Sequence, residues 1–547
     1  MKTAWTREES KERFPYPVTP LGWSILQDAL RVNLRSIARE LGVRELEPQE
    51  VSRLVNHYVY ARKPFFGSLL DLRPRPWRLA WLGAQVVVLY SWLLASFPFR
   101  RQATLIERIP LVGIPLQWLL DYGQKRLSLE RAPLGSSFHA FARLVVKFIL
   151  VPRAYKAIRL WNRQAVPAIR EMASSNEEAR DRVIDEHNFF AFKNLLTERG
   201  NRFLECDFLV HFTKGALFGY LAAVLKNAGI ESPADLTIGL KDNVALEMYK
   251  RVKQSGSFGS AYAHLTDNWD LYHPTLGEKR EELERLLARY ERADLQLFES
   301  EQSARRRQIR ERVTAALNGS GYPLWFMAEL IELFEKLVAI DEQQRFYSSL
   351  QYPAAKMMFN QLSVRWVARG MLKQNDDIYF LTLEDIESVF SGGLHKSELA
   401  KLVESRRATF EAAWTSAPPM ELGPDLLPLE APRAPVPAPA VAAGFSGVAA
   451  SPGAFTGRAR RIRNFDDLME LKRGEVAILL TPNPVYGPFL DQAGAIVCET
   501  GGLLSHGAVV ARELSIPAVV GAEGIFEGVA DGAPLKVDGS AGTVHFV

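Results

Sequence analysis

The sequence predicts a multidomain protein in which a large, mostly α-helical domain is followed by a small α/β domain. The chain has 547 residues, more than the roughly 250–300 residues that one hydrophobic core usually organises. With 47% hydrophobic and 24% charged residues, its composition is that of a globular protein. A segment rich in Pro and Ala divides the chain, and the hydrophobic periodicity differs on its two sides.

Charge and cysteine content exclude several classes of protein. The 67 basic and 63 acidic residues nearly balance, whereas a nucleic-acid-binding protein would concentrate basic charge. The two cysteines, Cys206 and Cys498, supply neither a disulfide framework nor the spacing of a zinc site. The N-terminus is polar and lacks the apolar core of a secretory signal. We therefore expect a cytoplasmic protein with no nucleic-acid partner and no metal site of its own.

Residues 1–415 are predicted to form the helical domain. Residues 278–317, 325–362 and 363–372 carry apolar side chains at three- and four-residue spacing, which is typical of amphipathic helices. Asn227-Ala-Gly and Asn318-Gly-Ser-Gly have the composition of helix ends. Residues 377–381 are the one strand candidate in this part of the chain.

An uncharged stretch from Leu79 to Phe99 lies within this helical domain. A run of about 20 such residues is long enough to cross a bilayer. Polar residues interrupt the stretch, among them Gln85, and no second span accompanies it. A buried core helix is the preferred interpretation. The alternatives are a segment that docks on a membrane surface and a true membrane span.

Residues 416–443 are predicted to be a flexible linker. Alternating Pro and Ala favour extended polyproline II segments, which rise about 3 Å per residue. Such a linker is semi-rigid, and it would let a small domain move over tens of ångströms.

Residues 444–547 have the pattern of an α/β domain. Short β-branched runs at 458–462, 476–480, 495–498, 518–521, 535–537 and 543–546 are separated by glycines, and one helix is predicted at 506–514. About 100 residues of this kind form a domain of normal size.

The string from Glu499 to Gly521 carries the candidate site. Gly501 and Gly502 follow a buried strand and permit a tight turn. Ser505 can cap the helix that follows, which places His506 in its first turn. The free N–H groups and positive end of the helix dipole attract a phosphoryl group there. A neutral imidazole nitrogen is a competent nucleophile, so His506 is the predicted phosphoryl carrier.

Three further side chains are candidates to stabilise the phosphoryl group. Thr500 and Ser505 offer hydroxyl groups to its oxygens. Arg512, six residues after His506, would reach the phosphate or pair with Glu499. The alternative is that His506 is an ordinary histidine at a helix end.

The whole string resembles the phosphohistidine, or mobile, domain of the phosphoenolpyruvate-utilising enzymes, which include phosphoenolpyruvate synthase and rifampicin phosphotransferase. The matching residues are Gly501, Gly502, Ser505, His506, Ala511, Arg512, Glu513, Ile516, Pro517, Ala518 and Gly521. Flanking similarity lies at residues 447–457 and 537–544. The resemblance implies a swivelling domain whose His506 is phosphorylated and moves between two sites.

Residues 8–24, 262–278 and 375–386 resemble, more weakly, the helical substrate domain of rifampicin-phosphotransferase-like proteins. Leu265 stands where that family usually has an arginine. His264 with Asp270 could act as an acid/base pair on the hydroxyl of an acceptor. The alternative is a structural histidine at a helix junction.

No Walker-type loop is present, and no ATP-grasp region is recognised. The resemblance therefore implies an ATP-grasp partner in trans, of the pyruvate phosphate dikinase type, which binds ATP and Mg²⁺ and phosphorylates His506. The expected reaction is phosphoryl transfer from His506 to an oxygen of a small organic acceptor in the helical domain. Two alternatives are a regulatory or scaffold protein that uses phosphohistidine as a signal, and a membrane-surface enzyme acting on a lipid-like alcohol.

Overall fold

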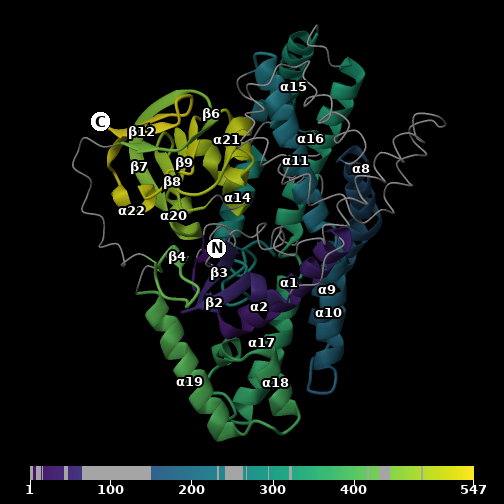
Figure 1. Ribbon diagram of the computed structural model, residues 1–547. Helices are drawn as coiled ribbons and strands as arrows, with labels where there is room; N and C mark the ends of the chain where they lie inside the picture. The colour runs from purple at the N-terminus through teal and green to yellow at the C-terminus, as the bar shows by residue number, and fades with distance from the viewer. Residues whose placement is uncertain are drawn as a thin grey trace, which may run out of the picture.

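The computed structural model describes residues 4–7, 14, 16–41, 47–63, 150–230, 233–238, 240, 263–266, 268–292, 295–318, 323–415, 418–429, 444–481 and 484–547. These residues form a helical region and a C-terminal domain with a mixed β-sheet. Figure 1 shows the C-terminal domain in yellow and light green, lying beside the helices that run through the teal part of the chain. The multidomain α-helical and α/β organisation agrees with the prediction from the sequence.

The helical region contains both long helices and short helical turns. In chain order they are α1 (Pro20–Leu41), α2 (Pro48–Val51), α8 (Val151–Leu160), the π-helix η4 (Trp161–Ala165), α9 (Val166–Asp181), α10 (Phe189–Leu204), α11 (Asp207–Asn227), the 3₁₀-helix η5 (Pro233–Thr237), α14 (Arg280–Arg292), α15 (Leu295–Leu317), α16 (Leu324–Tyr347), α17 (Tyr352–Ala368), the 3₁₀-helix η6 (Asn375–Phe380), α18 (Leu383–Phe390) and α19 (Lys396–Ala413).

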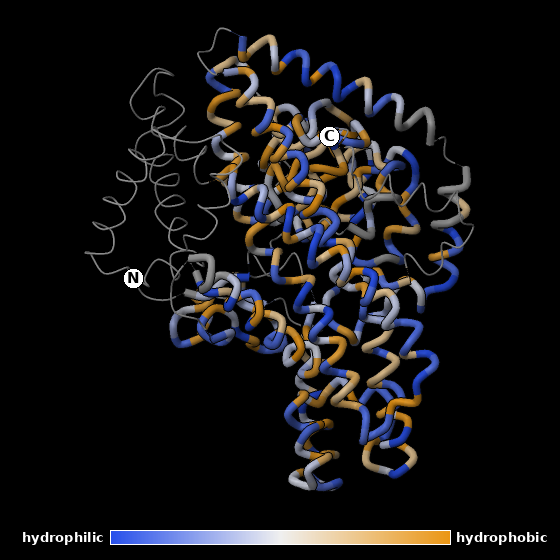
Figure 2. Tube along the Cα trace, turned by 90° about the vertical axis from the view of Figure 1, so that its right-hand side faces the viewer, coloured by the Kyte–Doolittle hydropathy of each residue, from blue (hydrophilic) through white to orange (hydrophobic). Residues whose placement is uncertain are grey.

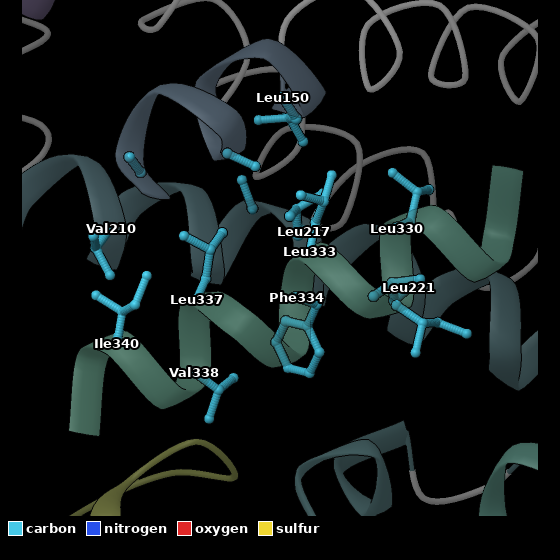
Figure 3. Close-up of a cluster of buried hydrophobic side chains, with 14 of the residues drawn as sticks. Leu150, Val210, Leu217, Leu221, Leu330, Leu333, Phe334, Leu337, Val338 and Ile340 are labelled. Atoms are coloured by element: carbon cyan, nitrogen blue, oxygen red, sulfur yellow. The ribbon is translucent and has the colours of Figure 1, made fainter. Parts of the chain in front are cut away.

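Helix α16 lies at the centre of the main core. Its buried residues occur on nearly every face, which is the pattern of a helix surrounded by protein. Figure 3 shows its leucines, among them Leu333 and Leu337, together with Val210 and Leu217 of α11. Hydrophobic stretches gather where the helices meet, and hydrophilic stretches follow the outer turns (Figure 2).

Most predicted helices are confirmed. The pattern over residues 278–317 corresponds to α14 and α15, and that over 325–372 to α16 and α17. The two predicted helix ends are also confirmed, since α11 ends at Asn227 and α15 ends at Leu317.

The strand predicted at residues 377–381 is wrong, because this segment belongs largely to η6. The reason is local. The Asp377 carboxylate accepts hydrogen bonds from the backbone N–H groups of Lys373 at 2.9 Å and Gln374 at 3.1 Å. Such side-chain bonds to nearby backbone favour a turn over an extended strand.

A small antiparallel sheet in the helical region was not predicted. Its strands are β1 (Ala4–Thr6), β2 (Ser52–Val55), β3 (Tyr58–Lys63) and β4 (Glu421–Leu422), in the order β2-β3-β1-β4. Strand β4 comes from the predicted linker, and its Leu422 pairs with Trp5. Leu422, Trp5 and Tyr60 share one buried cluster. The start of the predicted linker is therefore part of the folded helical region, whereas residues 430–443 lie outside the described residues.

The C-terminal domain is built on an eight-stranded sheet of order β5-β12-β11-β7-β8-β9-β10-β6. The four strands β7 to β10 are parallel neighbours, and the outer strands are antiparallel. The elements are β5 (Phe445–Ser446), β6 (Val448–Ser451), β7 (Ala454–Ile462), α20 (Phe465–Met469), β8 (Val476–Leu479), the 3₁₀-helix η7 (Pro484–Gln492), β9 (Ala495–Cys498), α21 (His506–Leu514), β10 (Ala518–Val520), α22 (Ile525–Gly528), β11 (Pro534–Asp538) and β12 (Thr543–Phe546).

All six strands and the helix predicted in this domain are confirmed. Every residue of β8 and β9 is buried, as expected for central parallel strands that are covered on both faces. Alternate residues of these strands belong to two different clusters, one on each face of the sheet.

The stretch from Leu79 to Phe99 lies outside the described residues. Among the residues that are described, one helical stretch, Phe189–Asn227, is long and apolar enough to cross a membrane by length and composition. Most of it is buried inside the protein, and α11 packs against α16 in the main core. It therefore has the properties of a core helix.

Candidate functional site

The site lies at the turn that joins the carboxyl end of β9 to the start of α21. Gly501 has a φ of +109°, a conformation that side chains other than hydrogen rarely adopt. A Cβ atom at Gly501 would also lie 2.7 Å from Ser505 Oγ, whereas one at Gly502 would meet no described atom within 4 Å. The predicted tight glycine turn is therefore confirmed.

His506 is the first residue of α21, and its side chain contacts the helical region. Its Nδ1 forms a short hydrogen bond with the carboxylate of Glu342 on α16. Because an ionised carboxylate only accepts hydrogen bonds, Nδ1 carries the proton, and in the neutral ring the lone pair lies on Nε2. Nε2 is buried and has no hydrogen-bond partner among the described residues.

Glu342 is held as an anion. Burial by itself would raise the pKa of its carboxyl group, but the adjacent His506 ring and then Arg345 outweigh burial, so the pKa lies below its ordinary value. The neighbouring Asp341 accepts a hydrogen bond from Lys214 Nζ of α11 at 2.5 Å and lies 3.4 Å from Arg345 Nε. These two cations overcome burial and hold the pKa of Asp341 well below its usual range.

Ser505 differs from the prediction. It occupies the N-cap position of α21, but its hydroxyl group makes no capping hydrogen bond. The backbone places Ser505 Oγ beside Gly501 rather than over the first N–H groups of the helix. Ser505 Oγ is buried and has no hydrogen-bond partner within the described part of the chain.

Thr500 holds the ends of two strands together. Its hydroxyl group donates to the backbone oxygen of Leu480 at 3.1 Å and lies 2.9 Å from Thr481 Oγ1. Thr500 therefore fixes the start of the turn that leads to His506.

Arg512 is buried and 2% exposed. It donates to the backbone oxygens of Ala450 at 2.8 Å and Leu503 at 2.7 Å, and to Thr237 Oγ1 of the helical region at 3.1 Å. Burial lowers the pKa of its guanidinium group to about 10. In this arrangement Arg512 supports the turn through Leu503, while the Glu499 carboxylate accepts a hydrogen bond from the Phe526 N–H.

His264 and Asp270 lie against different elements. His264 Nδ1 is 3.2 Å from Ser349 Oγ, and its ring packs edge-on against Phe346 with centroids 5.0 Å apart. Asp270 accepts hydrogen bonds from Thr19 N at 2.5 Å and Thr19 Oγ1 at 2.9 Å, directly before α1. Burial raises the pKa of Asp270 despite these bonds.

His264 and His506 nevertheless approach the same side of α16. Glu342 and Phe346, four residues apart, lie on one face of α16, and Ser349 follows in the turn just after the helix ends at Tyr347. The structure thus brings His506 to the last turns of α16 and His264 to the C-terminal end of the same helix.

The C-terminal domain is docked on this side of the helical region. Leu265, Leu276, Leu283 and Phe346 of the helical region share a buried cluster with residues of the sheet and of α21. Gln302 of α15 donates to the backbone oxygen of Glu513 at 2.6 Å. The docked arrangement leaves 12% of the His506 side chain exposed.

Two cavities lie elsewhere in the helical region. One, of about 100 Å³, has a mainly apolar lining from α1, α10 and α17. Another, of about 360 Å³, is lined by charged residues near η6 and α19, among them Arg407 and Glu404. His506 and His264 line neither of these two cavities.

Comparison with known proteins finds a family similarity for the domain that contains this turn. The family model described as "PEP-utilising enzyme, mobile domain" matches residues 471–542. This part of the C-terminal domain is therefore similar to the mobile domains of the phosphoenolpyruvate-utilising enzymes.

Curated relatives agree with this assignment. The rifampicin phosphotransferase of Bacillus subtilis (strain 168) is 28% identical over 217 residues, which cover 39% of this chain and 24% of that protein. The uncharacterized phosphotransferase YvkC of the same organism is 30% identical over 215 residues, covering 38% and 26%. Chondramide synthase cmdD of Chondromyces crocatus is 40% identical over 116 residues, covering 19% and 3%. The chain thus matches about a quarter or less of the length of these relatives.

Glu342, which bonds to His506, was not predicted from the sequence, nor were the charged residues near it, Asp341, Lys214 and Arg345. One signal was present in the sequence. Asp341 and Glu342 directly follow the apolar run 337–340 of α16, and Lys214 interrupts the mostly apolar sequence of α11. Charged residues are rarely buried without partners, so such interruptions on two core helices predict an ion pair between them.

Proposed function

We propose that this chain is a phosphotransferase component in which Nε2 of His506 carries a phosphoryl group from an external donor to an oxygen of a small organic acceptor. The observation that supports the proposal is the hydrogen bonding of the two ring nitrogens of His506. Nδ1 is held by the Glu342 carboxylate, and Nε2 is left with a lone pair and no described partner. That is the state required of a nucleophilic imidazole.

The surroundings of Nε2 suit a phosphoryl group. His506 begins α21, so the free N–H groups of the first helical turn and the positive end of the helix dipole lie beside it. The Ser505 hydroxyl is a donor without a described partner, and the Gly502 position has open space where a side chain would be. Backbone and hydroxyl donors of this kind stabilise phosphoryl oxygens.

The donor is expected to be a separate ATP-grasp protein that binds ATP and Mg²⁺. It would split ATP to AMP and phosphate while phosphorylating His506. The similarity to phosphotransferases, which covers under half of this chain, supports phosphoryl transfer as the general reaction.

The acceptor is expected to bind in the helical region, near the face of α16 that both histidines approach. A hydroxyl, enol or carboxyl oxygen would attack phosphorus, and His264 is the candidate base for its proton. Asp270 supports the same loop through its hydrogen bonds to Thr19. Transfer needs positioning and charge stabilisation more than covalent machinery, which a docked carrier domain would supply.

The test is to incubate the chain with candidate ATP-grasp proteins, Mg²⁺ and ATP labelled in the β- or γ-phosphate. We expect an acid-labile, base-stable label that is lost in His506→Ala and kept in His545→Ala, a control at an exposed position of the same domain. Label that persists in His506→Ala would refute the assignment. If His506 is labelled but no acceptor from cell extracts discharges it, a regulatory role replaces the transferase.

A further inference from the structure

We infer that Glu342 is a positioning residue that activates the phosphorylated His506 for discharge, and that it does so only while the C-terminal domain is docked on α16. The inference rests on the proposed function, since it concerns the release of the phosphoryl group that His506 is proposed to carry. Its basis is the hydrogen bond that joins the Glu342 carboxylate to Nδ1 of His506 across the two domains.

The chemistry depends on the proton at Nδ1. When the phosphoryl group leaves Nε2, the electron pair of the N–P bond returns to that nitrogen. If Nδ1 is protonated, the leaving group is a neutral imidazole; if it is not, the leaving group is a far more basic imidazolide anion. The new P–O bond forms to the acceptor oxygen, whose proton passes to a base or to water. A carboxylate beside Nδ1–H favours the protonated ring and therefore the better leaving group.

The two partners belong to different parts of the fold. Glu342 lies on α16 in the helical region, and His506 begins α21 in the C-terminal domain. The Gln302–Glu513 hydrogen bond and the Arg512–Thr237 hydrogen bond join the same two parts. A carrier domain that moves away to a donor would lose the carboxylate together with these contacts. The phosphorylated ring would then lose a proton more readily, and its N–P bond would be more durable in transit.

Among the charged groups around the Glu342–His506 pair, Glu342 is the carboxylate that bonds to the His506 ring. Besides His506, the charged groups that act on Glu342 are Arg345 and Asp341 on α16 and Arg512 on α21. Asp341 in turn interacts with Lys214 and His211 on α11, and Arg512 with Asp235 in η5 and Glu513 on α21.

Asp341 and Arg512 have their own partners in the structure. Asp341 is neutralised by Lys214 and Arg345, at 2.5 Å and 3.4 Å. Arg512 is bonded to the backbone oxygens of Ala450 and Leu503. Glu342 therefore has the ring of His506 as its closest partner.

The test uses phosphoramidate, a small phosphoryl donor that needs no partner protein. The full-length chain is treated with it at pH 8, and phosphorylation of His506 is checked by ³¹P NMR against His506→Ala. If wild-type His506 accepts no phosphoryl group from phosphoramidate or from ATP-grasp partners, the proposed function fails and this inference fails with it. If His506 is phosphorylated, the fate of the inference depends on Glu342 alone.

The rate at which His506 loses its phosphoryl group is then measured from pH 5 to 9 for wild type, Glu342→Gln and Glu342→Asp. The control is Glu332→Gln, whose carboxylate is exposed on the same helix. We expect Glu342→Gln to slow discharge about tenfold at pH 8, because the ring loses the carboxylate that favours a proton on Nδ1. The rates of the two proteins should converge as the pH falls towards 5, because a higher proton concentration favours the protonated ring in both. Glu342→Asp should recover most of the loss, and Glu332→Gln should match wild type.

Two results would overturn the inference while leaving the phosphohistidine intact. One is a Glu342→Gln profile that superimposes on that of wild type. The other is a rate lowered by the same factor at every pH, which would assign Glu342 a role in folding or docking rather than in protonation of the ring.

Discussion

At the scale of single residues, different residues of the turn before α21 set its backbone conformation and supply its polar side-chain atoms. Gly501 supplies a backbone conformation that brings the chain from β9 to the helix, while His506 and Ser505 supply the reactive and hydrogen-bonding atoms. Thr500 and Arg512 fix the ends of the turn through Leu480 and Leu503. The polar atoms that remain free of described partners are the ones at which a phosphoryl group would bind.

Substitution of the two glycines tests this division. Gly501→Ala forces a Cβ atom into a left-handed conformation and against Ser505 Oγ, and should cost about 1–3 kcal/mol of stability. Gly502→Ala, with open space at the Cβ position, should change the free energy of unfolding by under about 0.5 kcal/mol. Chemical denaturation followed by fluorescence measures both. Equal losses in the two variants would contradict the assigned role of Gly501.

The sequence predicted this turn because its signals are local. Glycines, serine and histidine follow one another within a few residues, so their spacing is visible without a fold. Glu342 is 164 residues from His506 along the chain, and no local pattern links the two. Only the packing of α21 against α16 brings them together, which is why the partner of the ring could not be predicted.

At the scale of elements, α16 combines a hydrophobic core helix with a charged centre. Its leucines pack against α11, while Asp341 and Glu342 in the following turn face cations and the His506 ring (Figure 3 shows the apolar part). A buried carboxylate is stable only when it is paired. The ion pair between Asp341 and Lys214 therefore joins the two central helices and fixes the rotation of α16 that presents Glu342.

Removal of Lys214 from its buried ion pair with Asp341 should lower the free energy of unfolding. Lys214→Met leaves Asp341 with weaker compensation and should lower the free energy of unfolding by about 3 kcal/mol at pH 7. Lys336→Met removes an exposed pair with Glu332 on α16 and should cost under about 0.5 kcal/mol. Urea denaturation of both variants measures the difference. A loss of similar size in the two variants would show that the buried pair contributes little.

The stability lost in Lys214→Met should depend on pH in a defined direction. Because the pKa of Asp341 is held below its ordinary value, its contribution is complete above about pH 4 and is lost as pH falls through the lowered pKa. The gap in stability between wild type and Lys214→Met should therefore be constant from pH 6 to 8. It should narrow as pH falls below about 4. Thermal unfolding at pH 3, 4 and 7 checks this, and a gap that widens in acid would be inconsistent with an ionised Asp341.

The sequence predicted long elements better than short ones. The C-terminal strands lie between glycines and carry β-branched residues, and α14 to α17 have clear three- and four-residue periodicity. The small sheet was missed because β1 and β4 have three and two residues, too few to show alternation. In η6, the side-chain bonds of Asp377 override the apolar residues that suggested a strand.

At the scale of the whole molecule, the docked C-terminal domain covers its own reactive residue. The shared cluster of Leu265, Leu276, Leu283 and Phe346 holds the domain on the helical region, and little of the His506 side chain is exposed there. In the proposed function a donor would have to reach the ring from outside, so this arrangement would suit delivery to an acceptor better than charging by a donor.

A variant that weakens docking should change the rate of His506 phosphorylation and the rate of its discharge in opposite directions. Leu283→Asp places a charge in the shared cluster, where the leucine is 8% exposed. It should speed phosphorylation of His506 by phosphoramidate and slow discharge at pH 8, each by several-fold, because the undocked ring is more accessible and lacks Glu342. Time courses by ³¹P NMR measure both rates. Glu284→Gln, at an exposed position of the same helix, is the control, and rates unchanged in Leu283→Asp would contradict the role of docking.

The pairing of β4 with β1 sets an upper limit on the distance between the C-terminal domain and β4. With Leu422 paired to Trp5, 14 residues, 430 to 443, separate the part of the chain described up to residue 429 from the part described from residue 444. Even at full extension of about 3.3–3.6 Å per residue, that length covers roughly 50 Å. If His506 is phosphorylated by a separate protein, as proposed above, that protein would have to bring its catalytic centre within this distance of β4, which would require the two to form a complex.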